Sequence, residues 1–561
     1  MDEMFQRFPH IGEKIMDQLD NGDLTDCRIV NALWRSCIDS QKVVWIRMIH
    51  NWIAICSEWQ NIYKVLNVDM VRNLAKGVYK FYSDNKDEDY KPPLEFAATI
   101  GNTEIVARLF KKEAFENTDS MANEYGKPFH RAAEHGHSDV CRFFIENIED
   151  KNPKDTEGST PLHEAALNGH FVICRMILEN IDDKNPVNKE QLGGCTPLHE
   201  AAQNNHLAIC RLIMKSVSDK NPRDGDGWTP LHYASRKGHL AVCLTFLLNI
   251  EEKNPRNDQG RTPLHFAVEE GHNEICRLII EYADDKNPGD MNGRTAFHDA
   301  AERGNLEICQ LMLENLQGEL PQDDFEFTPL DTAVFYGQFS AFKLIFQYVQ
   351  KNHFSTKVGY TTLREAIQEG QTEICKFLID NRVQFDAEDH HGVTPLHLAA
   401  ELGHLEIFKV ICNSVNEQIN EQSPSNFGHT PLHTAAISGH LEICKFIIEN
   451  NGDLNKTGNA GERPIHLAAE YGHLEILRLI FNKGGECADE FGRPLLHYAA
   501  EFGHLEMCKF ILENMDDQNR NCFDGKSPHE LATEMGHDEV CKLLKFYDDL
   551  PMNLSKRPRL L

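Results

Sequence analysis

Histidine and cysteine are the residues of this chain whose number and spacing could support chemistry. The sequence contains 28 histidines and 17 cysteines among 561 residues. Ten histidines recur in a Thr-Pro-Leu-His pattern, and ten more follow a glycine position later in the same repeated segment. A metal site needs ligands that converge, and the repeat frame offers no such set. We therefore predict no metal site and no cofactor, and we expect rings near helix starts to bond backbone groups or the threonine hydroxyl.

Ten cysteines share one position of the repeated segment, which argues for packing and against thiol chemistry. In the other copies this position holds Val106, Phe342, Phe408 or Leu477, so it requires an apolar side chain. A buried free cysteine behaves as a small apolar residue, so we expect inert thiols and a reducing compartment. Cys195 lies in a turn, and we expect it to react readily. The ten repeated cysteines are Cys141, Cys174, Cys210, Cys243, Cys276, Cys309, Cys375, Cys444, Cys508 and Cys541.

The segment 220–252 shows which elements position these residues. Thr229 is a suitable N-cap and Pro230 suits the first helical position, so a short helix begins there and ends at Gly238. A second helix is predicted over 240–247, where apolar residues recur at i, i+3 and i+7. The polar, turn-rich residues before the first helix predict a projecting finger loop. A helical hairpin of this kind leaves one face uncovered, which only the next copy can bury.

Close copies of this segment recur through most of the chain. The spacing between successive Thr-Pro-Leu-His leucine positions is 33 residues in nine of thirteen intervals. The pattern TPLHxAA followed by GHxEIC at this period resembles the ankyrin repeat, which implies an all-α ankyrin-repeat solenoid of about fourteen helix-turn-helix repeats with finger loops. Asp331, Arg364 and Glu530 replace the motif histidine. The marker positions are Leu94, Phe129, Leu162, Leu198, Leu231, Leu264, Phe297, Leu330, Leu363, Leu396, Leu432, Ile465, Leu496 and His529.

The ankyrin resemblance also implies where a partner binds. In such repeats the two residues before the motif glycine line a concave groove together with the fingers, so we expect an acidic groove with aromatic anchors. A protein substrate with a basic and apolar segment would fit this groove, and salt would weaken its binding. Trp228 is either such an anchor or packs against the next finger. The expected groove residues are Trp228, Arg236, Lys237, Glu269, Glu270, Glu302, Phe335, Tyr336, Glu369, Tyr471 and Phe502.

The charge of the chain limits its partners. Lysine and arginine number 57 against 87 aspartates and glutamates, and the formal net charge of −30 repels phosphate backbones, so we expect no nucleic acid ligand. The first residues show no signal segment, and no apolar run approaches the roughly 20 residues that span a bilayer. We expect no membrane contact and a cytoplasmic location. The KRPR sequence at 556–559 resembles a short nuclear-import signal, and a solvated tail is the alternative.

The first fifty residues do not follow the repeat. Apolar residues at helical spacing start after Phe8, break at Asn21, and resume after Asp23. This pattern resembles an F-box, and the resemblance implies docking onto the Skp-type linker subunit of a cullin complex. The alternative is a helical cap on the first ankyrin repeat. The residues that would contact the linker subunit are Pro9, Ile15, Leu19, Leu24, Val30, Trp34 and Trp45.

The chain therefore divides into four predicted parts. These are an F-box-like domain (1–50), a helical linker (51–88), an ankyrin-repeat solenoid (89–545) and a disordered tail (546–561). No nucleotide-binding, hydrolase or metalloprotease motif occurs in a suitable context, so we predict a non-catalytic adaptor. It is either the substrate-recognition subunit of a Skp-cullin-F-box ubiquitin ligase, or a scaffold or anchoring adaptor whose N-terminal helices are only a cap.

Overall fold

The structure is a computed structural model that describes residues 93–116, 126–189, 193–352, 360–381, 393–414, 418–423, 427–515 and 525–548. The chain divides into two compact units, residues 1–296 and 297–561. Within the described ranges, regular structure consists of α-helices, a short 3-10 helix and two isolated β-bridges, as the predicted all-α repeats require. None of these helices has the length and apolar composition to cross a membrane.

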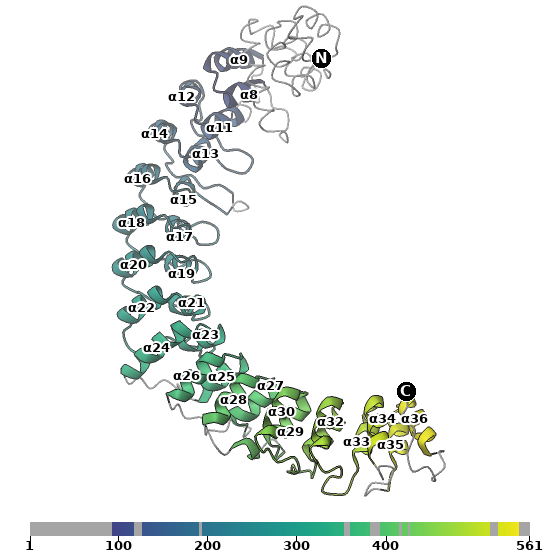
Figure 1. The fold of residues 1–561 in the computed structure, drawn as a ribbon. Helices are drawn as coiled ribbons and strands as arrows, with labels where there is room; N and C mark the ends of the chain where they lie inside the picture. Colours follow the sequence, from purple (N-terminus) through teal and green to yellow (C-terminus); the bar gives the residue numbers. More distant parts are fainter. Residues whose placement is uncertain are drawn as a thin grey trace, which may run out of the picture. The chain divides into compact units, whose positions relative to one another are not determined.

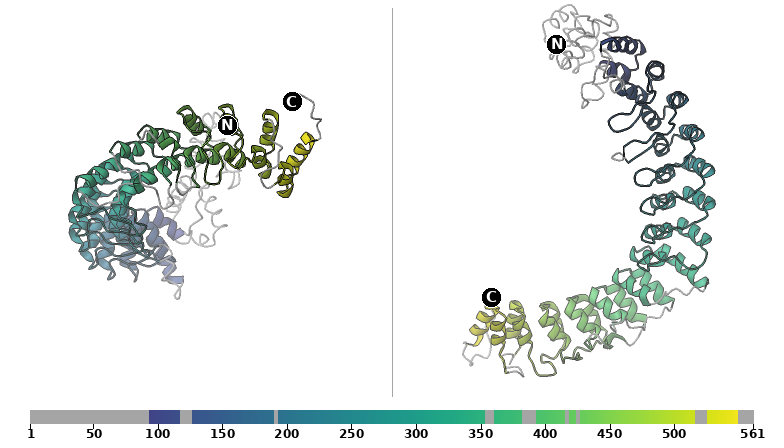
Figure 2. Two further views of the ribbon diagram at one scale, coloured as in Figure 1. Left: turned by 90° about the horizontal axis from the view of Figure 1, so that it is seen from below. Right: turned by 180° about the vertical axis from the view of Figure 1, so that it is seen from behind.

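In the first unit, a short inner helix and a longer outer helix alternate along the chain. Inner helices pack on inner helices and outer helices on outer helices, so the pairs stack in two rows (Figures 1 and 2). The inner helices are α8 (Pro93–Thr99), α11 (Gly126–Glu134), α13 (Pro161–Leu167), α15 (Pro197–Gln203), α17 (Pro230–Arg236) and α19 (Pro263–Glu269). The outer helices are α9 (Thr103–Glu116), α12 (Ser138–Asn147), α14 (Phe171–Asn180), α16 (Leu207–Ser216), α18 (Leu240–Asn249) and α20 (Asn273–Tyr282).

The second unit continues the same alternation, and the described helices of the two units make fourteen pairs, as predicted. Its inner helices are α21 (Ala296–Arg303), α23 (Pro329–Phe335), α25 (Tyr360–Gln368), α27 (Pro395–Leu402), α29 (Pro431–Ser438), α31 (Pro464–Glu470), α33 (Leu495–Glu501) and α35 (Pro528–Glu534). Its outer helices are α22 (Leu306–Asn315), α24 (Phe339–Lys351), α26 (Thr372–Asp380), α28 (Leu405–Ser414), α30 (Leu441–Glu449), α32 (Leu474–Asn482), α34 (Leu505–Asn514) and α36 (Asp538–Asp548). A 3-10 turn, η3 (Gln418–Asn420), lies between α28 and α29.

The inner helices begin and end for the reasons read from the sequence. Thr229 is extended, forms a capping box with His232, and is followed by Pro230 as the first residue of α17. Gly238 follows the helix with φ of +79°, a left-handed conformation that glycine adopts without strain. In the preceding repeat the equivalent position is Asn205, with φ of +62°. Asparagine is among the few residues other than glycine that tolerate a left-handed conformation.

In most of its copies the histidine of the Thr-Pro-Leu-His pattern joins one repeat to the next. Nδ1 of His232 accepts the backbone N–H of Thr229 at 3.0 Å, so Nε2 carries the proton and donates to the carbonyl of Arg261 at 3.2 Å. In the second unit His433 makes the same two bonds, to the N–H of Thr430 and the carbonyl of Glu462. These bonds confirm that the rings near the helix starts are structural.

Burial keeps these histidines neutral. It lowers the pKa of His232 and of His433 to about 3, because the charged ring would lose its hydration among packed helices. A second proton would also put an N–H of the ring against the N–H of the threonine. Burial lowers the pKa to about 4 in four further rings of the set, namely His163, His199, His397 and His466.

A second set of histidines follows the left-handed position and bonds back to the preceding repeat. Nε2 of His473 donates to the carbonyl of Ile437 at 2.9 Å, and Nε2 of His504 donates to the carbonyl of Glu470 at 2.7 Å. These carbonyls lie at the C-terminal ends of inner helices, where no intrahelical partner exists. The ring of His473 packs closely on Gly439, the left-handed glycine of the preceding repeat. A Cβ built at Gly439 would lie 2.5 Å from Cε1 of His473.

The Lys-Asn-Pro sequence of several fingers is also explained by capping. Nζ of Lys253 donates to the carbonyl of Leu247 at 2.6 Å and to that of Ile250, at the end of α18. Oδ1 of Asn254 accepts the N–H of Leu264 in the first turn of α19 at 3.3 Å. The shared tripeptide therefore connects one outer helix to the next inner helix.

The repeated cysteines fill the core of the outer helices, as predicted. Nine of the ten are fully buried, and burial raises the pKa of Cys243 to about 12, which removes the thiolate needed for reaction. Cys541, in the last described helix, is only half-buried. Cys195 contradicts its prediction. Its side chain is 8% exposed with Sγ 3.9 Å from Oη of Tyr233, and burial raises its pKa to about 11, so it is not a readily reactive thiol.

Acid is expected to destabilise the array through the first set of histidines. Six of them have folded pKa values of about 3 to 4, below the 6.5 of an unperturbed ring, so between pH 6.5 and 4 the unfolded chain binds more protons. Their contribution to the free energy of unfolding is complete above pH 6.5. It falls as the pH drops towards 4, by up to about 1.4 kcal/mol per pH unit for each ring. Urea midpoints between about pH 7.5 and pH 5 measure the effect. A midpoint that stays constant over this range contradicts it.

The close approach of the second set predicts a difference between two glycines. Gly439 and Gly271 have nearly equal left-handed φ values, +81° and +76°, but a Cβ at Gly271 meets nothing within 4 Å. Both alanine variants are expected to lose about 1–2 kcal/mol from backbone strain, and Gly439→Ala is expected to lose more because its Cβ meets His473. Urea midpoints of Gly439→Ala with and without His473→Ala test this cause. If removing the ring leaves the excess loss unchanged, contact with the ring is not the cause.

Candidate binding surface

Five of the predicted groove residues lie in the first unit. Arg236 and Lys237 are exposed at the end of α17, and at the end of α19 Glu269 is half-buried and Glu270 exposed. Nε of Arg236 lies 3.7 Å from Oε1 of Glu270, and Glu269 pairs with Arg261 at 2.9 Å. Exposed ion pairs contribute at most about 1 kcal/mol, so a partner can exchange with them. This part of the surface mixes both signs of charge.

Trp228 lies on the finger before α17 and packs partly on the following repeat. Its ring centroid is 4.2 Å from that of Phe266 and 5.2 Å from that of Tyr233, and the guanidinium of Arg236 lies 5.7 Å from its centre. The side chain is half-buried. These contacts support the packing alternative for much of the ring and leave one part of it accessible.

The other six predicted groove residues lie in the second unit, and two of them form an aromatic pair. Phe335 ends α23 and Tyr336 follows it, and each side chain is 46% exposed. Their ring centroids are 5.1 Å apart in an edge-to-face arrangement. Glu302, near the end of α21, is half-buried, while Glu369, just after α25, is exposed. An exposed aromatic pair, with carboxylates at the ends of the inner helices α21 and α25, is a suitable anchor for a basic and apolar side chain.

A further set of carboxylates was missed by the sequence analysis. Burial raises the pKa of Glu365 in α25 to about 7, and the nearby carboxylates of Asp331 and Glu369 raise it further. In the first unit burial likewise raises the pKa of Glu164 to about 7 and raises that of Glu200. All three glutamates follow the motif histidine position directly, so this position could have been read from the repeat alignment.

Tyr471 and Phe502 occupy the same place in later repeats of the second unit. They directly follow α31 and α33, and they are 50% and 44% exposed. Met535, directly after α35, is 56% exposed and belongs to the same set, although the sequence analysis omitted it. The alignment would have found it, because it too precedes a left-handed glycine.

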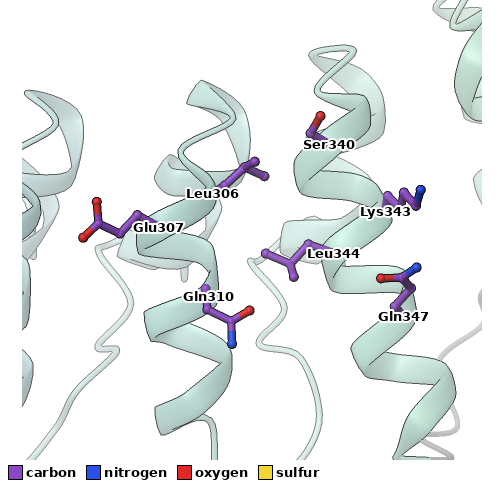
Figure 3. Close-up of a pocket in the computed structure, with 7 residues that line it drawn as sticks. All are labelled: Leu306, Glu307, Gln310, Ser340, Lys343, Leu344 and Gln347. Carbon is purple, nitrogen blue, oxygen red and sulfur yellow. The ribbon is translucent and has the colours of Figure 1, made fainter.

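A separate, open hollow of about 390 Å³ lies between the outer helices α22 and α24 of the second unit (Figure 3). Leu306 and Leu344 point into the space between the two helices, whereas Glu307 and Lys343 point away from it. The other residues that line it are Gln310, Ser340 and Gln347.

One histidine pair departs from the regular pattern. His429 and His433 are four residues apart, a spacing compatible with metal binding. Their rings stack with centroids 5.2 Å apart, and Nε2 of His429 lies 2.7 Å from Oε1 of the buried Glu462. Both ring nitrogens of His433 are already hydrogen-bonded to the protein. In the described ranges no three His, Cys, Asp or Glu side chains are grouped so that they could hold a metal ion.

The predicted linker-subunit contacts lie outside the residues that the structure describes. They are Pro9, Ile15, Leu19, Leu24, Val30, Trp34 and Trp45. The same is true of the KRPR sequence at 556–559. These predictions therefore depend on the sequence alone.

Comparison with known families identifies the repeats. A family model of three ankyrin repeats matches residues 62–155, 129–224, 212–290, 283–355, 343–423, 413–490 and 482–553. The first match begins at residue 62, ahead of residue 89, where the sequence analysis placed the start of the solenoid. No curated protein matches the chain. Ankyrin repeats are protein–protein interaction domains. The chain belongs to the ankyrin-repeat family.

Proposed function

We propose that this chain is the non-catalytic substrate-recognition subunit of a ubiquitin ligase of the Skp-cullin-F-box type. The F-box-like pattern of residues 8–45 would bind the Skp-type linker subunit, and the ankyrin array would bind a protein substrate. The observation that carries the binding half is the exposed aromatic pair Phe335 and Tyr336 at the end of α23, whose neighbouring inner helix α25 carries the half-buried carboxylate of Glu365. The link to the ligase is supported by the sequence resemblance.

The chemistry of this surface selects the kind of substrate. Glu365 has a raised pKa because it is buried beside other carboxylates, and a cation brought by a partner would stabilise its charged form. The rings of Phe335 and Tyr336 offer apolar area and negative π faces to the same partner. A substrate segment that carries basic and apolar side chains satisfies both features, and the net charge of −30 would speed its approach.

The proposal assigns a place to each part of the chain. Residues 1–50 would bind the linker, residues 51–88 would connect it to the array, and residues 89–545 would hold the substrate. Residues 546–561 would form a tail, whose KRPR sequence would allow entry to the nucleus from a cytoplasmic location.

The second candidate function is that of a scaffold or anchoring adaptor whose N-terminal helices only cap the array. One observation favours it. Within each unit, described inner helices pack on one another in succession, and ankyrin repeats of this kind serve protein–protein interaction whether or not the N-terminal segment binds a linker subunit.

Replacing Trp34 with alanine distinguishes the two functions. If Trp34 anchors the linker subunit, the variant loses linker capture in a pull-down while its thermal unfolding stays nearly unchanged, because interface anchors are often large aromatics. If Trp34 instead packs in a cap, the variant loses roughly 3–5 kcal/mol of stability, as for a buried aromatic. Failure of the unmodified chain to capture the linker rejects the ligase proposal.

The substrate surface is tested by Trp228→Ala and Tyr336→Ala, separately and together. A substrate is first identified by proximity labelling in cells, and its affinity is then measured. Loss of the exposed ring of Tyr336 is expected to weaken binding by about tenfold or more, loss of the half-buried Trp228 is expected to weaken it less, and added salt is expected to weaken it further. A matched control is Met291→Ala, since this side chain is 72% exposed on a finger. Undiminished affinity in the double variant, or affinity that rises with salt, places the site elsewhere.

A further inference from the structure

Two rows of side chains are formed by residues at the C-terminal ends of three successive inner helices, α31, α33 and α35. The residue that directly follows each helix is large, apolar and exposed: Tyr471, Phe502 and Met535. The last residue of each helix is an acid: Glu470, Glu501 and Glu534. We name these six residues the acid–apolar stripe.

The backbone beneath the stripe is held in a fixed register. Nε2 of His504 donates to the carbonyl of Glu470 at 2.7 Å, and Nε2 of His537 donates to the carbonyl of Glu501 at 2.9 Å. The three inner helices also pack on one another in succession. Packed helices lie roughly 8–10 Å apart, so the stripe presents an acid and an apolar group at about that interval. A partner binding to it would therefore meet a preorganised surface.

We propose that the acid–apolar stripe binds an extended protein segment in which a basic and an apolar residue recur at every third position. An extended chain of the polyproline II type has three residues per turn and advances about 3.1 Å per residue, so every third side chain lies on the same face at intervals of about 9 Å, which match the interval between helices. The inference rests on the proposed function of the array as a substrate reader and specifies the chemistry that the last repeats would recognise.

The charges around the stripe favour a basic occupant. Glu501 and Glu534 have cations nearby, in Arg493 and in Lys526 at 2.7 Å, but these pairs are part-exposed and exchangeable. Among the described residues no cation pairs with Glu470. Burial raises the pKa of Glu470 and the carboxylate of Glu501 raises it further, while the charge of Arg493 lowers it in part, so an additional cation from a partner would stabilise the charge of Glu470.

The same charges disfavour other occupants. A nucleic acid or an acidic peptide would place like charges against the three glutamates. A second copy of this stripe would do the same, since it carries the same carboxylates. A basic segment without apolar residues would leave Tyr471, Phe502 and Met535 in water, so both features are required for tight binding.

The experiment measures binding of a fluorescent peptide to the full chain. The probe repeats Lys-Leu-Ser about four times, and the control peptides have the same composition with the lysines and leucines alternating or in separate blocks. The period-three peptide is expected to bind about tenfold more tightly than either control. Equal affinity for the three peptides overturns the proposal, because it would show attraction by charge alone.

Two triple variants test the two rows separately. Glu470→Gln with Glu501→Gln and Glu534→Gln is expected to weaken binding about tenfold or more, and so is Tyr471→Ala with Phe502→Ala and Met535→Ala. The chain offers a matched control for each row. For the acids it is a Glu→Gln triple on the outer helices of the same repeats, at Glu475, Glu506 and Glu539. For the apolar row it is a Phe→Ala triple on exposed fingers, at Phe325, Phe427 and Phe491.

The controls separate this inference from the proposed function. If a control triple reduces the affinity for the period-three peptide as strongly as the matching stripe triple does, the contact lies elsewhere and the proposal is overturned. Thermal unfolding of every variant is compared with the unmodified chain, and a leucine triple at the apolar row, which keeps the apolar surface, is expected to retain binding. Linker capture through residues 1–50 is measured in parallel. Its failure would reject the ligase role and leave the stripe intact, whereas loss of the stripe would leave linker capture intact.

Discussion

The hydrogen bonds that histidines make between neighbouring repeats are the constraint on which the rest of the structure depends. A single helical hairpin has unpaired groups at both ends of its inner helix. One histidine satisfies the helix start and donates to the next finger, as His232 does to Arg261, and another donates to the helix end in the preceding repeat, as His473 does to Ile437. Because both bonds cross a repeat boundary, the hairpin is completed only by its neighbours.

The constraint explains which predictions from sequence succeed. Thr229, Pro230 and Gly238 identify the inner helix because each acts on its own local backbone. The bond of His232 to Arg261 leaves no such signal, because a backbone carbonyl is present whatever residue stands there. Cys195 was wrongly predicted to react readily for a related reason. It occupies the position directly before the N-cap threonine, which packs against the next repeat, and only the three-dimensional stack shows this.

The constraint is relaxed around α23 and α25, where the surface also changes. Asp331 replaces the motif histidine, and its Oδ2 accepts from both the N–H and the hydroxyl of Thr328 at 2.9 and 2.8 Å. A carboxylate keeps the helix start in this way, but when ionised it has no proton to donate onward. Gln371 stands where other repeats have the second histidine, packed against Gly337. The exposed rings of Phe335 and Tyr336 lie in this same segment.

Folding and binding place their demands on different atoms of the same residues. The two residues before the left-handed position contribute backbone groups to the packing between repeats, but in the repeats after the first their side chains are at least partly exposed. The fold accepts Leu167 and Asn168 there, and equally Arg236 and Lys237. The recurrence of an acid followed by a large apolar residue in three successive repeats, from Glu470 to Met535, is therefore not required by the helix ends. Recognition of a partner is a physical reason for keeping three such apolar side chains exposed to water.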